Sequence, residues 1–312
     1  MRAVVIADGE LRVEEHPDPE PGAGEIRVRV RAAGLNGADM LQRKGGYPAP
    51  PGSPQDIPGL EFAGEVEARG PGAERFEEGE RVMAVVGGGG QAERALVHER
   101  AAMPVPESLD WPEAGGVPEV FVTAHDALFS QAGLRPGERL LVHGGAGGVG
   151  TAAIQLGRAA GARVTATVRR EELRGEVESL GATAIDPEGF AEHGPFDVVL
   201  ELVGAPNLPD NLGALQTGGR IVVIGVGAGF KAEVNLLAVM GKRAKLMGAT
   251  LRPRPLEEKA QAMRLVEHEV LPLFEAGDLR VPVAATFPLD EVEDAYARFE
   301  AGGKLGKIVV LP

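Results

Sequence analysis

Residues 139–150 read RLLVHGGAGGVG, a short apolar run followed by a turn in which five of seven residues are glycine. The run RLLVH (139–143) is typical of a buried strand, and the residues after the turn predict a helix at Thr151–Ala160. Gly145, Gly147 and Gly150 have the spacing GxGxxG. In this context Gly145 permits a tight turn, Gly147 lets a pyrophosphate approach the backbone, and Gly150 lets the helix pack on the strand. The helix N-terminus then offers unpaired N–H groups to the phosphates.

A glycine-rich turn that binds nothing is the competing interpretation, and the neighbouring sequence decides between the two. Strands and helices alternate after the turn, with a further helix at Glu171–Leu180. Apolar runs that predict strands lie at Arg163–Val168, Thr183–Ile185, Phe196–Val203, Arg220–Val226 and Ala244–Thr250. Because these runs are apolar throughout, they indicate a parallel sheet covered on both faces. The middle of the chain therefore predicts a doubly wound Rossmann domain that binds a dinucleotide.

The residues before this region predict a different kind of domain. Glu25–Ala33 alternates apolar and charged residues, the pattern of a half-buried strand, and Phe62–Ala68 and Arg81–Val86 are further strand candidates. A short helix is expected after Asn36, which is a candidate N-cap, with Asp39 placed to reach back to it. The result is a β-rich domain with one short helix.

The C-terminal segment does not continue the alternation of the middle region. It predicts a long helix at Pro255–Glu275, a strand at Val281–Phe287, a helix at Leu289–Ala301 and a last strand in KIVVL (307–311). We expect this segment to return and complete the N-terminal domain.

Composition excludes several classes of function. The 312 residues include 46 acidic against 32 basic side chains, a formal net charge of −14, which disfavours nucleic-acid binding. There is no cysteine, so disulfides, thiolate zinc sites and iron–sulfur clusters are excluded, and the six histidines show no zinc-binding spacing. No stretch approaches the roughly 18–20 apolar residues of a membrane span, and the N-terminus lacks a signal layout, so we expect a cytoplasmic protein.

Blocks along the whole chain carry a family resemblance. They are AAGLNGADMLQRKGGYPAPPG (32–52), IPGLEFAGEV (57–66), GGGGQAE (87–93), PEVFVTAHDAL (118–128), HGGAGGVGTAAIQL (143–156), GATLRPR (248–254) and GKIVVLP (306–312). The chain resembles the zinc-free branch of the medium-chain dehydrogenase/reductase superfamily, the quinone oxidoreductases related to ζ-crystallin, and most of all the p53-inducible quinone oxidoreductase group.

The resemblance implies an α/β fold of two domains. A GroES-like β-rich domain is expected at residues 1–117 and 257–312, and a Rossmann domain with its doubly wound parallel sheet at 118–256. In the family the cofactor lies in the cleft between them, and the last Rossmann strand, here near Ala244–Thr250, commonly pairs across a homodimer. We therefore expect a homodimer.

The resemblance also assigns residues to the site. Asn36 and Tyr47 are expected to face the nicotinamide end of the cofactor and to polarise the acceptor carbonyl as hydrogen-bond donors. Asn36 serving only as a helix cap is the competing interpretation. The expected cofactor contacts are Thr123, Gly145, Ala146, Gly147, Gly148, Val149, Gly150, Arg169, Arg170, Gly225 and Leu251.

The zinc positions of the superfamily are occupied by other residues in this chain. Zinc-dependent relatives have a Cys ligand where this chain has Asn36, a His ligand where it has Leu60, and a third ligand, Cys, where it has Glu119. The resemblance thus implies a metal-free site.

These observations together predict an NADPH-dependent reductase of quinones or α,β-unsaturated carbonyls. Without a Lewis acid to stabilise an alkoxide, alcohol dehydrogenation is disfavoured, whereas an electrophilic acceptor can take hydride directly. Two alternatives stay open: reduction of an enoyl thioester, and an NADPH-binding protein with little turnover.

The choice of NADPH rests on Arg169 and Arg170, which follow the second strand of the Rossmann pattern. A carboxylate at this position accepts from the 2′-OH of NAD, whereas an arginine accommodates the 2′-phosphate of NADP. A guanidinium binds phosphate oxygens bidentately, so we interpret Arg170, with Arg169, as the clamp for that phosphate. Two arginines that begin a solvated helix are the alternative, and Glu171 is close enough in sequence to contact a ribose hydroxyl.

We expect Arg170→Ala to weaken the preference for NADPH over NADH by about tenfold, because the 2′-phosphate loses a charged hydrogen-bond partner. The measurement is kcat/KM with each coenzyme for the wild type and the variant. An unchanged preference would contradict the clamp.

Overall fold

The computed structural model describes all residues from Met1 to Pro312. The chain folds into two compact units: a terminal unit, Met1–Val122 with Leu251–Pro312, and a central unit, Thr123–Thr250. The domain limits expected from the sequence lie five residues away at the first boundary (117 against 122) and six at the second (256 against 250). No helix is both long and apolar enough to cross a membrane.

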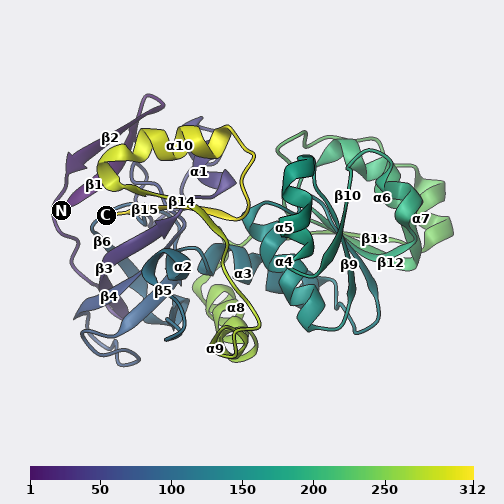
Figure 1. The fold of residues 1–312 in the computed structure, drawn as a ribbon. Helices are drawn as coiled ribbons and strands as arrows, with labels where there is room; N and C mark the ends of the chain where they lie inside the picture. Colours follow the sequence, from purple (N-terminus) through teal and green to yellow (C-terminus); the bar gives the residue numbers. More distant parts are fainter. The chain divides into compact units, whose positions relative to one another are not determined.

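The central unit, coloured teal to green in Figure 1, is built on a parallel sheet. This sheet has six strands in the order β10-β9-β8-β11-β12-β13. Counted from β8, this is the order 3-2-1-4-5-6 of a Rossmann sheet, with its switch point between β8 and β11. The strands are β8 (Arg139–Val142), β9 (Arg163–Thr167), β10 (Ala182–Ile185), β11 (Phe196–Glu201), β12 (Leu215–Val223) and β13 (Lys245–Gly248). The predicted doubly wound sheet is confirmed.

Short helices connect these strands. They are η2 (Asp126–Gln131), α4 (Gly148–Ala159), η3 (Glu171–Leu173), α5 (Arg174–Glu178), η4 (Phe190–His193), η5 (Ala205–Asn207), α6 (Leu208–Ala214) and α7 (Leu236–Lys242). Neighbouring residues of a strand point to opposite sides of the sheet. Because these strands are apolar at successive positions, both faces of the sheet are apolar. Leu141 packs with Leu212 of α6, whereas a Cβ at Gly157 of α4 would collide with Leu140.

The terminal unit is built on a seven-stranded sheet and a two-stranded one. The seven-stranded sheet has the order β14-β15-β3-β4-β5-β7, and β6 pairs with β3. The strands are β1 (Arg2–Ala7), β2 (Glu10–Glu15), β3 (Glu25–Gly34), β4 (Glu61–Arg69), β5 (Arg81–Val85), β6 (Arg94–His98), β7 (Ala102–Pro104), β14 (Val283–Pro288) and β15 (Lys307–Leu311). Strand β15 pairs antiparallel with the end of β3, so the C-terminal segment completes the N-terminal sheet, as predicted.

The terminal unit contains more helices than the sequence predicts. They are α1 (Gly37–Arg43), η1 (Glu99–Ala101), α2 (Trp111–Gly115), α8 (Leu256–Glu269), α9 (Leu271–Glu275), η6 (Leu289–Glu291) and α10 (Val292–Glu300), and α3 (Pro118–His125) begins here and ends in the central unit. The helical stretch expected at Pro255–Glu275 is present, but it is divided at Val270 into α8 and α9. Pro272 lies in the first turn of α9 and has no N–H to continue the hydrogen-bond ladder of α8.

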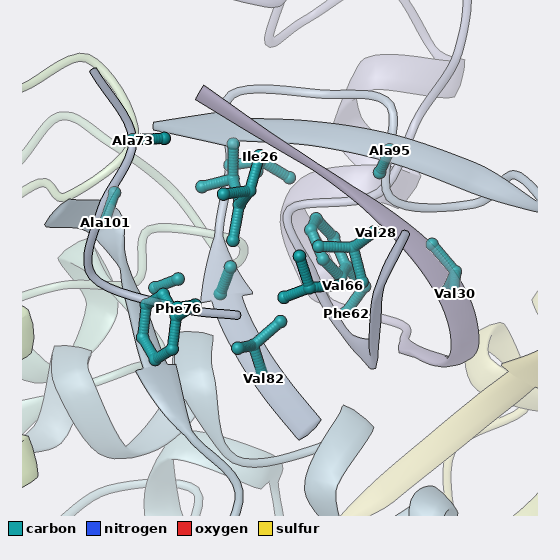
Figure 2. Packing of buried hydrophobic residues seen from close by; sticks show 14 of the residues in the cluster. Ile26, Val28, Val30, Phe62, Val66, Ala73, Phe76, Val82, Ala95 and Ala101 are labelled. Atoms are coloured by element: carbon teal, nitrogen blue, oxygen red, sulfur yellow. The ribbon is translucent and has the colours of Figure 1, made fainter. Parts of the chain in front are cut away.

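The core of the terminal unit lies against β3, β4 and β5. Figure 2 shows Ile26 and Val28 of β3 close to Phe62 and Val66 of β4 and Val82 of β5. All five side chains are buried, and in β3 they alternate with arginines at 27, 29 and 31. At roughly 1.5–3 kcal/mol for each large apolar side chain removed from water, this cluster stabilises the sheet that carries the residues at the end of β3.

Candidate functional site

The glycine-rich turn of the central unit joins β8 to α4 as the sequence predicts. A Cβ at Gly145 would lie 2.7 Å from the Cβ of Ala166, and one at Gly150 would collide with the carbonyl oxygen of Gly144. At Gly147 the nearest atom to such a Cβ is 3.4 Å away. Gly145 and Gly150 are therefore required for packing inside the protein, whereas Gly147 leaves room beside the backbone.

The N-terminus of α4 has no side-chain cap. Gly147 is the N-cap residue, and the helix continues for 12 residues to Ala159. The first N–H groups of an α-helix have no partner within the helix, and they carry the positive end of its dipole. The backbone N–H groups of Gly148, Val149 and Gly150 thus form a site that suits a phosphate.

A buried hydrogen-bond network holds this turn in place. The Thr167 hydroxyl, at the end of β9, accepts from the Gly144 N–H at 3.1 Å, and the Gly145 N–H donates to the Thr167 carbonyl at 3.0 Å. His143 lies 3.2 Å from the same hydroxyl through Nδ1 and 2.8 Å from Asn211 Oδ1 through Nε2. Burial lowers the pKa of His143, which keeps its ring neutral as a link in this network.

The two arginines lie just beyond the end of β9. Arg169 and Arg170 are both exposed, and Arg170 Nη1 is 3.5 Å from the carboxylate of Glu172. An exposed ion pair of this kind contributes little to stability, so Arg170 can exchange it for another anion.

The other expected cofactor contacts occupy varied surroundings. Gly225 follows β12, and a Cβ there would collide with the backbone of Leu202. Thr123 is partly exposed on α3 in the central unit, whereas Leu251 is 7% exposed and belongs to the terminal unit. Ala146 is partly exposed at the glycine-rich turn.

In the terminal unit Asn36 begins α1, but its side chain does not cap the helix. The Asp39 carboxylate reaches back to the Asn36 N–H at 2.8 Å, which is the predicted half of a capping box. The Asn36 amide instead donates to the Gly34 carbonyl at 3.2 Å and to Glu61 Oε1 at 2.8 Å. Its oxygen accepts from Lys307 Nζ at 2.8 Å. Both amide hydrogens and the amide oxygen are therefore engaged inside the protein.

Lys307 and Glu61 form a buried ion pair beside Asn36. Lys307 Nζ lies 2.6 Å from Glu61 Oε1, and the side chains are 3% and 0% exposed. The three hydrogens of the ammonium group are matched by three acceptors: Leu35 O, Asn36 Oδ1 and Glu61 Oε1. This pair was not predicted from the sequence, because Lys307 and Glu61 are 246 positions apart.

Glu119 lies on the other side of Glu61. Its backbone N–H donates to Glu61 Oε2 at 2.8 Å, while its own Oε2 is buried and has no hydrogen-bond partner. Burial, reinforced by the negative charge of Glu61, raises the pKa of Glu119 to about 8. Burial also raises the pKa of Asp39, to about 6, although hydrogen bonds from backbone N–H groups stabilise its charged form and oppose this rise. At pH 7 Glu119 is thus protonated and Asp39 is ionised.

Arg252 fixes the position of Tyr47. Its Nη1 donates to the Tyr47 carbonyl at 3.0 Å, and its guanidinium carbon lies 5.0 Å from the centre of the Tyr47 ring, within cation–π range. Further bonds run to Gly87 O at 2.8 Å and Gln42 Oε1 at 2.6 Å. Arg252 is 2% exposed, whereas Tyr47 is partly exposed. The contact between Arg252 and Tyr47 was not predicted from the sequence.

Burial and the charge of Glu119 both raise the pKa of Tyr47, so its phenol stays neutral. A cavity of about 530 Å³ in the same unit is lined by Gly87, whose carbonyl Arg252 binds, and by Lys259, whose ammonium interacts electrostatically with Glu119. Its volume is within the range of small-molecule pockets.

The residues at the superfamily's zinc positions do not fit a zinc ion. Zinc sites in proteins use thiolate, imidazole and carboxylate ligands, usually four in structural sites and three in catalytic ones. Here Leu60 has no donor atom, the Asn36 oxygen accepts from an ammonium group, and Glu119 is the only carboxyl among the three positions. The structure contains no group of three or more His, Cys, Asp or Glu residues arranged to hold a metal.

The chain has extensive similarity to known oxidoreductases. Residues 22–107 match the alcohol dehydrogenase GroES-like domain, and residues 180–310 match the zinc-binding dehydrogenase family. The chain is 32% identical to quinone oxidoreductase of Homo sapiens and 31% identical to that of Rattus norvegicus, in each case over 94% of this chain and 91% of the relative. An alcohol dehydrogenase superfamily protein from Novosphingobium aromaticivorans superposes with a TM-score of 0.88 at 30% identity, covering 100% of this chain and 99% of that one.

We expect the stability of the wild type to fall with rising pH relative to Glu119→Gln. The folded pKa of Glu119, about 8, is above its unfolded value of 4.5, so the folded state retains a proton that the unfolded chain releases. Stability is therefore lost between about pH 4.5 and pH 8, and the substitution removes this loss. Thermal unfolding at about pH 5 and about pH 8 measures it; parallel pH dependences of the two proteins would show that Glu119 ionises normally.

Proposed function

Because this chain belongs to the medium-chain dehydrogenase/reductase family, with quinone oxidoreductases among its relatives, we propose that it is an NADPH-dependent reductase of quinones or α,β-unsaturated carbonyls. The observation that carries the proposal is the uncapped N-terminus of α4 behind the Gly145–Gly150 turn, which fits the pyrophosphate of a nicotinamide coenzyme. When bound, the coenzyme supplies a hydride to the acceptor.

The residues of the central unit bind and select the coenzyme. The N–H groups of Gly148, Val149 and Gly150 hold the pyrophosphate, with Gly147 leaving space for its approach. Arg170, with Arg169, binds the 2′-phosphate, and the exposed position of both after β9 supports this role. Thr123, Ala146, Gly225 and Leu251 complete the proposed contacts.

The residues of the terminal unit orient and polarise the acceptor. Tyr47 is neutral and held by Arg252, so its O–H can donate a hydrogen bond to the acceptor oxygen, where negative charge develops. Asn36 has no amide hydrogen left to donate to a substrate. Its part is to position Glu61 and Lys307 beside the site.

We propose that the reaction proceeds without a metal ion. The donor set at positions 36, 60 and 119 does not suit zinc, and no step of the proposed reaction requires a Lewis acid. An acceptor that is already electrophilic needs only orientation, exclusion of water and hydrogen bonds to its oxygen.

The wild type should oxidise NADPH when a 1,4-benzoquinone or an enone is added, and more slowly with a crotonyl thioester. Tyr47→Phe should lower kcat/KM for the quinone and the enone by about fivefold to tenfold, since one hydrogen bond to the developing oxyanion is lost. Absorbance of NADPH measures both. Faster turnover of the thioester would favour an enoyl-thioester reductase, and tight NADPH binding without turnover of any acceptor would favour a binding protein.

We also propose that the protein is a homodimer formed through the central unit. Strand β13 is at the edge of the sheet, and Leu246 on it is 49% exposed. On the neighbouring helix α7, Leu236, Leu237 and Met240 are 70–77% exposed. Such a group of exposed apolar side chains beside an open sheet edge is typical of an interface.

We expect Leu237→Glu to convert the dimer to a monomer, because it places a charge among apolar side chains that the interface would bury. Sedimentation equilibrium of the wild type and the variant measures the mass, and Leu41→Glu, at an exposed leucine of the terminal unit, is the control. A monomeric wild type would refute the proposal.

A further inference from the structure

Three carboxyl groups lie close together in the terminal unit, and they differ in hydrogen bonding. Asp39 accepts from the backbone N–H groups of Asn36 and Gly59 at 2.8 and 3.1 Å. Glu61 accepts from Asn36 and Lys307 and from the backbone of Glu119. Glu119 is the carboxyl that has a buried oxygen without any partner. Donated hydrogen bonds stabilise a carboxylate, and the buried oxygen of Glu119 receives none.

The nearby cations do not replace those missing bonds. All three hydrogens of the Lys307 ammonium are donated to Leu35, Asn36 and Glu61. The hydrogen bonds of the Arg252 guanidinium go to Gly87, Tyr47 and Gln42. Both cations favour the ionised form of Glu119 through space, but Glu61 and Asp39 oppose them and burial outweighs them. Glu119 therefore keeps its proton at neutral pH.

Glu119 is also the most accessible of the three carboxyls. Asp39 and Glu61 are both 0% exposed, whereas Glu119 is only partly buried. When ionised, Glu119 interacts electrostatically with Tyr47, the proposed hydrogen-bond donor to the acceptor, and with Lys259, which lines the cavity. Glu119 is thus the one of the three carboxyl residues that is not fully enclosed, and it interacts electrostatically with the residue proposed to bind the acceptor.

We propose that Glu119 is a catalytic acid, which protonates the oxygen of the acceptor as it is reduced. This inference rests on the proposed reductase function. The acceptor gains a hydride, and with it the two electrons that the coenzyme loses, and its oxygen becomes negatively charged. The O–H bond of Glu119 breaks while an O–H bond forms on that oxygen. Glu119 is left as a carboxylate and regains a proton from water.

Glu119 suits this step better than Tyr47 does. The pKa of Tyr47 is raised from its usual value of 10, whereas that of Glu119 is about 8, so the carboxyl is the stronger acid and still holds its proton at pH 7. An acid with a pKa near the working pH is the most effective general acid. Tyr47 then stabilises the oxyanion by a hydrogen bond, and Glu119 neutralises it.

The acceptor decides how much this proton matters. The enolate formed from an enone is a stronger base than the monoanion of a hydroquinone, which can leave the protein unprotonated. We therefore expect Glu119→Gln to lower kcat by about 10²-fold with an enone. The loss with 1,4-benzoquinone should be clearly smaller.

The pH profile separates a proton donor from a structural residue. With the enone, the wild-type kcat should fall above about pH 8 as Glu119 ionises, and this fall should be absent in Glu119→Gln. Glu119→Asp keeps a carboxyl and should restore part of the rate together with the pH dependence. Glu74→Gln makes the same chemical change at an exposed glutamate and should leave the rate and the profile unchanged.

A second measurement uses the protein without coenzyme. Infrared difference spectra between about pH 7, where Asp39 is already ionised, and about pH 9 should show the C=O stretch of a protonated carboxylic acid disappearing in the wild type. This band should be missing in Glu119→Gln and present in Glu74→Gln.

Three results would overturn the proposal. The first is a Glu119→Gln variant with the wild-type rate and pH profile for the enone. The second is a spectrum in which Glu119 is already ionised at about pH 7. Both leave the reductase function intact. The third is a wild type that fails to oxidise NADPH whichever quinone or enone is added. That result refutes the proposed function itself and the role of Glu119 with it.

Discussion

The buried ammonium group of Lys307 is the interaction on which the terminal unit's site depends. It is the first residue of β15, and it binds the Leu35 carbonyl, the Asn36 amide oxygen and the Glu61 carboxylate. The C-terminal strand is thereby tied to the end of β3 and the start of β4. Removing one partner of such a pair leaves an uncompensated buried charge, which typically costs about 3–5 kcal/mol. The ion pair between Lys307 and Glu61 therefore holds residues 36 and 61 in position and leaves no uncompensated charge buried beside them.

The two proposed sites, one for phosphate in the central unit and one for the acceptor in the terminal unit, are built by different means. In the central unit the phosphate site is made of backbone, and side chains only support it, through Thr167 and His143 behind the turn. In the terminal unit the site is made of side chains brought from four segments, at Asn36, Glu61, Glu119 and Lys307. The phosphate site depends on glycines, which have no side chain to block the backbone. The acceptor site depends on which charged side chains the fold brings into contact.

That difference explains how much could be predicted from the sequence. The glycine-rich turn is local, and its spacing together with the alternating strands and helices after it predicted the Rossmann sheet, which the structure and its neighbours confirm. Asn36 was predicted correctly as the start of a helix, with Asp39 reaching back to it. Its side chain was expected to donate to the acceptor, but its amide hydrogens go to Gly34 and Glu61; the sequence did not indicate this, because Glu61 and Lys307 are 25 and 271 positions away. The division of the C-terminal helical stretch at Val270 was available from Pro272 but was not predicted.

The protonation of Glu119 follows from its burial and from where the nearby hydrogen bonds are donated. The three hydrogens of the Lys307 ammonium are donated to Leu35, Asn36 and Glu61, and none of them reaches the carboxyl of Glu119. The charges of Lys307 and Arg252 act through space to lower the pKa of Glu119, whereas burial, the largest effect, and the negative charges of Glu61 and Asp39 raise it to about 8. Glu119 thus keeps its proton beside two cations because neither of them donates a hydrogen bond to its buried oxygen.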